Sequence, residues 1–178
     1  LLIAKGAHVN YQPNNLFYGL GGTALIESIE SKSIEAITFL LNQGAKPNTK
    51  GNHTALIKAV SLGRMDVVSL LLSYNANINA QSYSSSPFAQ SVILWKNPPT
   101  QEDINLTEYL LKNGAHCTKF DFEKIFQHET HIMKTTYDQK RSFLSRLLQK
   151  HERLLPIFNA HALYINNPFL LNSLGLLK

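Results

Sequence analysis

The chain has little cysteine and no long hydrophobic run. Cys117 is its single cysteine, which excludes an internal disulfide and suits a reducing compartment, so we expect an intracellular, cytoplasmic location. No apolar stretch approaches the ~20 residues that a helix needs to cross a bilayer. The sequence also lacks a Walker loop, a dinucleotide glycine fingerprint and a nucleophile elbow. These absences argue against an enzyme confined to these residues.

What the chain does have is an apolar fraction typical of a folded domain and an uneven charge. It is 178 residues long, 44% hydrophobic, with a formal net charge of +5. Residues 119–178 hold nine of the 17 basic and five of the 12 acidic residues, so the basic character belongs to the C-terminal third. The chain opens on Leu1 and not on Met, and we expect it to be a piece of a longer protein.

A repeated phrase is the strongest signal in the sequence. Thr23-Ala24-Leu25-Ile26 recurs as Thr54-Ala55-Leu56-Ile57, a spacing of 54 − 23 = 31. The double leucine at Leu40 recurs at Leu71, again with 71 − 40 = 31. Two separate landmarks shifted by the same amount predict a solenoid of stacked helical units. Such chains present an extended surface to a partner more often than they enclose a reaction.

The copy that begins at Thr54 predicts a helix pair. Thr54 is suited to cap the first helix, and Leu56 and Val60 then share a helical face. Gly63 predicts the tight turn between the helices. Asn75 stands where the second helix should end in a left-handed residue, a conformation that Asn tolerates.

This copy closely resembles the ankyrin repeat, whose motif reads Thr-Pro-Leu-His, then Ala-Ala, Gly, Val-Val-x-Leu-Leu-Leu and Gly-Ala-x-x-Asn. The matching residues are Thr54, Leu56, Ala59, Gly63, Val67, Val68, Leu70, Leu71, Leu72, Ala76 and Asn79. The copy departs from the motif at Ala55, Ile57 and Asn75, and we expect Ile57 to replace the missing histidine by packing. The resemblance implies an all-α ankyrin-repeat solenoid with loop or β-hairpin fingers.

The repeat divides the chain into six segments. Residues 1–22 are interpreted as the tail of a preceding repeat followed by an enlarged loop or finger at Tyr11–Gly22, because Gly6 and Gly44 are 38 residues apart. Repeats at 23–53, 54–85 and 86–120 follow, the last with an extended inter-helix loop at Trp95–Asp103, because Pro98-Pro99 cannot continue a helix. We expect Pro87 at the first position of its helix. Residues 121–156 predict a degenerate capping helix pair, and residues 157–178 a C-terminal helical extension.

Protein–protein interaction is the function that the resemblance implies, through the concave face and the loop tips. The candidate partner-binding residues are Tyr11, Phe17, Tyr18, Asn52, His53, Lys58, Tyr83 and Trp95. Tyr and Trp are favoured anchors because they bury a large area at a low entropy cost. The resemblance also implies hydroxylation of Asn79 as one interpretation, with a purely structural hydrogen bond as the other. We expect one or more protein partners and a monomeric module.

The sequence predicts no catalytic, metal or cofactor site. His128 and His131 are one residue too close for the zinc-protease motif, and no third ligand is evident near them. Cys117 has no partner base or oxyanion motif that the sequence reveals, so we interpret it as structural. No cofactor is therefore expected.

Two other functions remain open. The chain could be the targeting or regulatory part of a larger enzyme or effector whose catalytic region lies outside it. A basic stripe of Arg146, Lys150 and Arg153, spaced for one helix face, could instead bind nucleic acid or anionic lipid. A solvated capping face is the simpler interpretation of that stripe. The Asn-, Ile-, Lys- and Leu-rich composition fits an effector that intracellular bacteria deliver into the host cytosol.

Overall fold

The computed structural model describes residues 5–15, 19–31, 33–49, 53–82, 85–95, 99–118, 120–121 and 124–125. The chain divides into two compact units, Leu1–Pro87 and Phe88–Lys178. The first unit holds β1 (Asn14–Asn15), β2 (Gly19–Leu20), α1 (Ala24–Ser28), α2 (Ile34–Asn42), α3 (Ala55–Ser61) and α4 (Met65–Ser73). Two further helices follow, α5 (Pro87–Ile93) and α6 (Gln101–Lys112).

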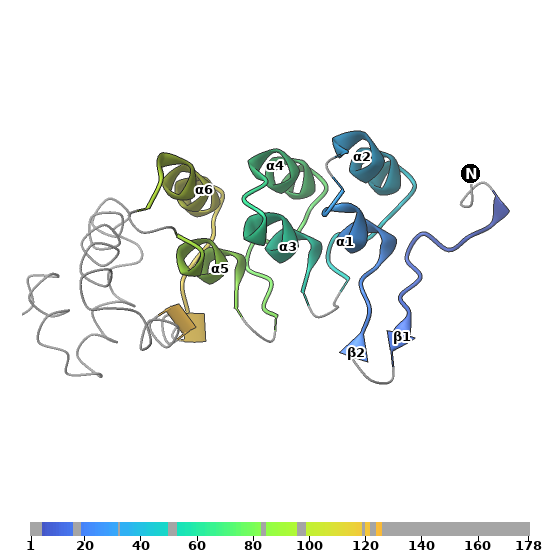
Figure 1. The fold of residues 1–178 in the computed structure, drawn as a ribbon, viewed down its shortest axis with the longest axis horizontal. Helices are drawn as coiled ribbons and strands as arrows, with labels where there is room; N and C mark the ends of the chain where they lie inside the picture. The colour runs from blue at the N-terminus through green and yellow to red at the C-terminus, as the bar shows by residue number, and fades with distance from the viewer. Residues whose placement is uncertain are drawn as a thin grey trace, which may run out of the picture. The chain divides into compact units, whose positions relative to one another are not determined.

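The first unit is built from two stacked helix pairs. Within each pair, α1 packs on α2 and α3 on α4, and the pairs meet through α1 against α3 and α2 against α4. Figure 1 shows α1 and α3 side by side in an inner layer and α2 and α4 in an outer layer, with the β1–β2 hairpin projecting from the inner-layer side. The predicted all-α stack of helix pairs with hairpin fingers is confirmed in the described part of the chain.

Equivalent threonines begin the two inner helices. Thr23 Oγ1 accepts from the Ile26 N–H at 3.4 Å, and Thr54 Oγ1 accepts from the Ile57 N–H at 3.3 Å. Both threonines are buried, so no water is at hand to satisfy the first N–H groups if the hydroxyl is removed. The predicted cap at Thr54 is confirmed.

Left-handed residues end the turns at the positions that the repeat predicts. Gly63 has φ = 66° between α3 and α4, and Asn75 has φ = 60° after α4. Gly44, the equivalent of Asn75 in the earlier pair, has φ = 84°. The turn after α4 is closed by the Ala76 N–H, which donates to Leu71 O at 3.0 Å. Asn75 and Gly44 therefore share a left-handed backbone conformation, which costs less free energy for glycine than for asparagine.

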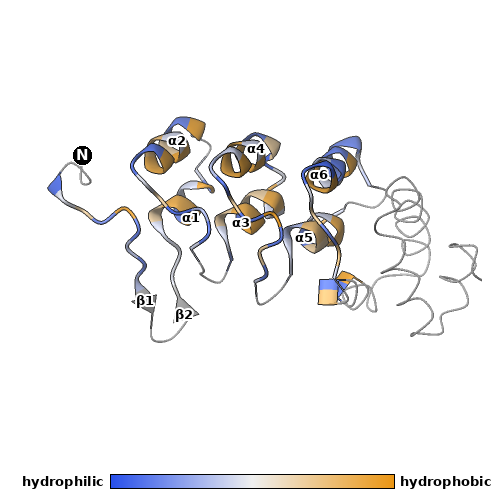
Figure 2. Ribbon diagram, turned by 180° about the vertical axis from the view of Figure 1, so that it is seen from behind, coloured by the Kyte–Doolittle hydropathy of each residue, from blue (hydrophilic) through white to orange (hydrophobic). Residues whose placement is uncertain are grey.

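Hydrophobic residues that recur every 31 positions form the core of the first unit. Figure 2 shows α3 as mostly hydrophobic, and Ile57 is fully buried in it, which confirms that Ile57 packs in place of the motif's histidine. The side chains with 1% exposure or less in this core are Leu25, Ile29, Ile37, Ala55, Leu56, Ile57, Ala59, Val60, Val67, Val68 and Leu71.

The enlarged segment ahead of α1 forms the β1–β2 hairpin. The strands pair antiparallel, with Asn14 opposite Leu20. At the base of the hairpin the Gly21 N–H donates to Pro13 O at 3.0 Å, and Gln12 Nε2 donates to Gly21 O at 2.9 Å. A Cβ at Gly21 would lie 2.7 Å from the Pro13 ring, so only glycine allows this close approach.

The second unit begins its helices at polar caps and at a proline. α5 starts at Pro87, as predicted. Thr100 and Asp103 form a capping box that starts α6 at Gln101, so the predicted loop at Trp95–Asp103 is too long at its C-terminal end. Thr118 and Asp121 repeat these contacts where the chain turns helical again at residues 120–121. Beyond residue 125 the predicted capping pair and C-terminal extension lie outside the described residues. No helix in the described part of the chain is long and apolar enough to cross a membrane.

Candidate partner-binding surface

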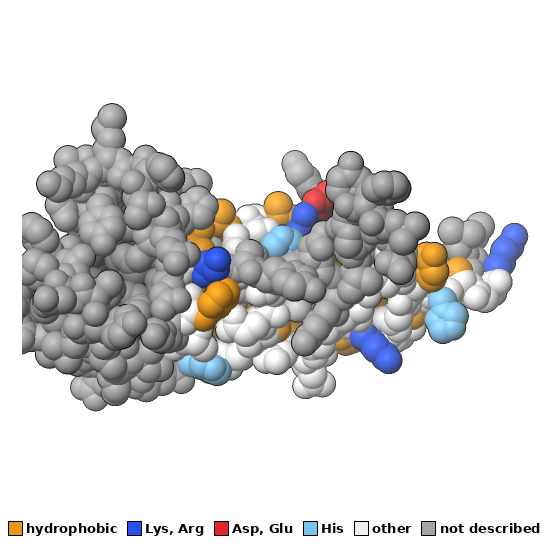
Figure 3. Space-filling model, turned by 90° about the horizontal axis from the view of Figure 1, so that it is seen from below, with side chains coloured by type: hydrophobic (Ala, Val, Ile, Leu, Met, Phe, Trp, Pro, Cys, Tyr) orange, Lys and Arg blue, Asp and Glu red, His pale blue; other side chains and the backbone are white. Residues whose placement is uncertain are grey.

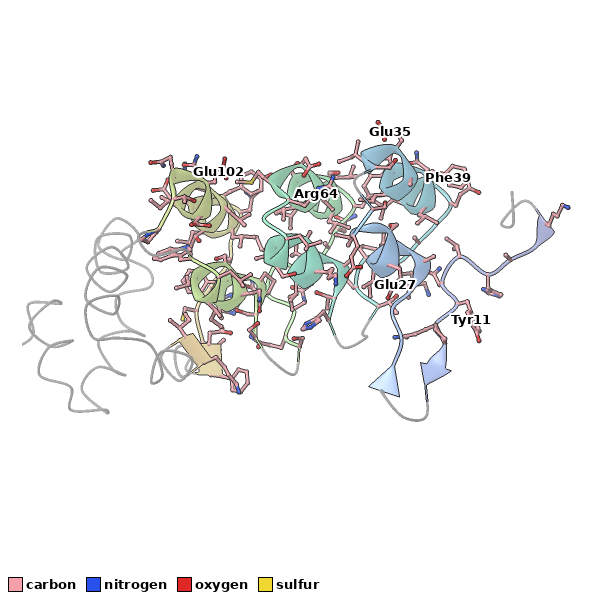
Figure 4. The ribbon with its side chains drawn as sticks, viewed as in Figure 1. Tyr11, Glu27, Glu35, Phe39, Arg64 and Glu102 are labelled. Atoms are coloured by element: carbon pink, nitrogen blue, oxygen red, sulfur yellow. The ribbon has the colours of Figure 1, made fainter. Side chains whose placement is uncertain are left out.

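Charged side chains lie at the same position of both inner helices. Glu27 on α1 and Lys58 on α3 are equivalent, since 58 − 27 = 31. Glu27 is exposed and Lys58 is half-buried. Figure 4 shows Glu27 on the side of α1 that faces away from the outer layer. Because the core side of both helices is buried, these side chains are presented from a rigid base.

An ion pair connects α3 to the turn that follows α1. Lys58 Nζ contacts Glu30 Oε1, from the turn that follows α1. The Glu30 side chain is 59% exposed, so the pair stabilises the fold by only about 0–1 kcal/mol. The sequence does not reveal the role of Glu30, because this residue lies 28 positions from Lys58 and outside the repeated motif. The pair thus leaves both charges accessible to a partner.

His53 lies directly ahead of α3 and is exposed. Its pKa is lowered because partial burial of the imidazole removes water, and because the positive charge of Lys58 opposes protonation. Both effects favour the neutral ring, which offers one donor and one acceptor. Of the predicted partner-binding residues, His53 and Lys58 are the two that the structure brings together.

Tyr11 is the most exposed large hydrophobic side chain in the described part of the chain, at 67%. Its backbone N–H donates to His8 O at 3.0 Å, in the segment that leads to β1. Figure 4 places Tyr11 on the side of α1 away from α3. Tyr11 is thus accessible, as predicted, but it does not share a site with residues of α3.

The prediction that Trp95 is an exposed anchor is wrong. Trp95 is 3% exposed, and its Nε1 donates to Thr107 Oγ1 of α6 at 3.0 Å. Trp95, two residues beyond the end of α5, therefore packs against α6 instead of extending into a loop. Trp95 belongs to the core of the second unit.

The remaining predicted site residues stay predictions. Asn79 is half-exposed, and its backbone N–H donates to Asn77 Oδ1 at 2.9 Å, so its hydroxylation stays a prediction. Seven candidates lie outside the described residues: Phe17, Tyr18, Asn52, Tyr83, Arg146, Lys150 and Arg153. The same holds for His128 and His131.

Within the described ranges neither a metal-binding cluster nor a reactive cysteine is found. No group of three or more His, Cys, Asp or Glu side chains there could hold a metal ion. Cys117 is fully buried, and its pKa is raised by burial and by the negative charge of Asp121. A thiol held protonated in this way is a poor nucleophile.

The loop-tip side of the molecule carries charges of both signs. Figure 3, seen from below, shows basic, acidic and histidine side chains interspersed with hydrophobic ones among the coloured residues.

Comparison with known proteins agrees with the geometry of the first unit. A family model described as ankyrin repeats in three copies matches residues 1–82. The chain is also similar to the B-cell lymphoma 3 protein homolog of Mus musculus, at 39% identity over 69 residues. This match covers 37% of the chain and 15% of the mouse protein, so the chain spans a small part of that relative's length.

Proposed function

We propose that residues 1–82, which match a family model described as ankyrin repeats, bind a partner protein through the exposed side chains of the inner helices. Ankyrin repeats generally mediate protein–protein interaction. The surface proposed here consists of Glu27, Glu30, His53 and Lys58, and it is called the inner-helix surface below.

The observation that carries the proposal is the pairing of Lys58 with Glu30 on a rigid base. Lys58 stands on a helix with five buried residues out of seven, so its backbone position is fixed by the core. The charge at this surface position differs between the two repeats, because Glu27 occupies on α1 the position that Lys58 occupies on α3. A fixed backbone with variable surface side chains provides specificity without disturbing the fold.

A charge reversal tests the proposal. Lys58→Glu removes the ion pair and places three carboxylates on the inner-helix surface, while the buried residues stay unchanged. The matched control is Lys112→Glu on α6, an exposed lysine that also faces a carboxylate, with Nζ 3.8 Å from Glu108 Oε2. Partners are captured with wild-type chain, identified by quantitative mass spectrometry, and then titrated against each variant.

The expected result is a Kd that rises about tenfold or more for Lys58→Glu and stays within about twofold for Lys112→Glu. Circular dichroism should show the same helix content in all three proteins. Equal affinities of the wild-type chain and Lys58→Glu for every captured partner would contradict the proposal that the inner-helix surface binds them.

A further inference from the structure

The same backbone turn ends α2, α4 and α6. Its left-handed residue is Gly44, Asn75 or Gly114, with φ of 84°, 60° and 100°. In each turn the N–H of this residue donates to a helix carbonyl three positions earlier, at 3.0, 3.1 and 3.1 Å. The three turns therefore share one geometry, and differences in their chemistry come from their side chains.

Only the turn after α6 combines asparagine with a following glycine. The dipeptides at the three turns are Gln43-Gly44, Asn75-Ala76 and Asn113-Gly114. The last of these is the only Asn-Gly pair in the sequence. Asn113 is exposed, and a Cβ built on Gly114 would meet nothing within 4 Å, so neither a side chain nor a neighbour crowds this peptide bond.

An asparagine in this position can lose its side-chain amide as ammonia. The backbone nitrogen of Gly114 attacks Asn113 Cγ, and a five-membered succinimide ring closes. The bond from Cγ to Nδ2 breaks, and ammonia leaves with the proton that the Gly114 nitrogen gave up. Water then opens the ring at one of its two carbonyls, which yields aspartate or isoaspartate.

The folded turn restrains both reacting groups. Asn113 Nδ2 donates to Tyr109 O at 2.8 Å, and the Gly114 N–H donates to Leu111 O at 3.1 Å. Both hydrogen bonds must open before the Gly114 nitrogen can lose its proton and reach Cγ. The rate of the reaction in the folded chain is therefore set by how often the end of α6 opens.

Neither product restores the original turn. Aspartate at position 113 has no side-chain donor for Tyr109 O, and it places a negative charge at the C-terminal end of α6, where the helix dipole opposes it. Isoaspartate lengthens the backbone path by one carbon atom, which displaces the Ala115 N–H from Leu110 O, now 2.9 Å away. Leu110 and Ala115 are both fully buried, so this displacement reaches the core of the second unit.

We propose that Asn113 is a deamidation site whose reaction is gated by opening of the turn after α6 and whose products weaken that turn. Water is the one co-reactant. The modification goes beyond partner binding, and it does not depend on the inner-helix surface.

Peptide mapping by mass spectrometry tests the proposal on protein aged at physiological pH and temperature. The expected result is deamidation at Asn113, with an isoaspartyl share identified by electron-transfer fragmentation. Gln43 and Asn75 should stay unmodified over the same period, because glutamine must close a larger ring and Ala76 carries a side chain. In urea that unfolds the chain, the rate at Asn113 should rise about tenfold or more, since no opening step is then required.

Asn113→Gln is the matched variant, because Gln43 precedes glycine in the same turn after α2. Aged wild-type chain should unfold at a lower urea concentration than fresh chain, whereas aged Asn113→Gln should keep its midpoint. Three outcomes overturn the proposal: deamidation at Asn113 no faster than at Asn75, equal rates at Asn113 in the folded and unfolded chain, or an unchanged midpoint after complete deamidation. None of them changes the expectation for Lys58→Glu, so the two proposals fail separately.

Discussion

Trp95 and Thr107 fix the end of α5 to α6 through a buried hydrogen bond. The indole Nε1 donates to Thr107 Oγ1 at 3.0 Å, and Thr107 Oγ1 lies 3.0 Å from Ser91 Oγ. Ser91 Oγ in turn donates to Phe88 O at 2.7 Å. All of these side chains are buried, so the chain of hydroxyls satisfies polar groups that water cannot reach.

Thr107→Val is therefore expected to destabilise the second unit by about 1–3 kcal/mol, because it leaves the indole N–H buried without its acceptor. Trp95→Phe removes the donor as well as part of the ring, and it should also lower the free energy of unfolding. The double variant should lose less than the sum of the two, by about 0.5 kcal/mol or more. Urea unfolding followed by circular dichroism measures all three. Strict additivity would contradict the hydrogen bond as a coupling element.

The regular repeat made most of the first unit predictable. A threonine, a left-handed turn residue and an apolar stripe each depend on local spacing, and Thr54, Asn75 and Ile57 all occur in the expected roles. The position of Trp95 was predicted wrongly, because Pro98-Pro99 favoured a long exposed loop. The spacing of Thr100 and Asp103 is a capping box that would have shortened this loop, so the signal was present in the sequence.

The candidate surface was predicted only in part. Lys58 and His53 follow from the position of the inner helix, and both reach the surface. The contact from Lys58 to Glu30 depends on how far two long side chains extend across neighbouring helices, which spacing alone does not give. Phe39 belongs to the apolar stretch of α2, and the sequence alone does not reveal that its side chain is 50% exposed.

Thr54→Ala tests the contribution of an inner-helix cap. The variant removes the acceptor for the Ile57 N–H at a site that is 4% exposed, so the free energy of unfolding should fall by about 1–2 kcal/mol. Thr54→Ser keeps the oxygen and should retain most of the stability. The urea midpoints of the two variants are compared at constant m-value. Equal losses in both would assign the effect to the methyl group.

Cys117 should make stability depend on pH in the alkaline range. Burial and Asp121 raise the pKa of the folded thiol far above its ordinary value of about 8.5. Above about pH 8.5 the unfolded chain releases this proton while the folded chain keeps it, so the free energy of unfolding declines as pH rises.

Two measurements check this prediction. Cys117→Ala should show a smaller decline than the wild-type chain when urea midpoints are compared between pH 8 and pH 10. A thiol reagent should label the wild-type chain slowly at pH 7.5 and quickly in denaturant, because Cys117 is the only cysteine. Rapid labelling of the folded chain would contradict a buried thiol.

Asn48 should contribute to stability by joining the two helix pairs of the first unit. Its side chain bonds to Asn75 O and to the Asn77 N–H, so it ties the loop after α2 to the loop after α4. Asn48→Ala removes both bonds, and since the site is exposed and water replaces them in part, we expect a loss of about 1 kcal/mol. Ser69→Ala is the matched control, because Ser69 is exposed and its Oγ donates only to Asp66 O within its own stretch of chain. The control should leave the urea midpoint unchanged or raise it slightly, since alanine favours the helix.

Hydrogen exchange adds a second readout: Asn48→Ala should speed exchange at the Asn77 amide more than at amides inside α4. Equal effects of the two variants would mean that the bridge between the loops does not hold the helix pairs together.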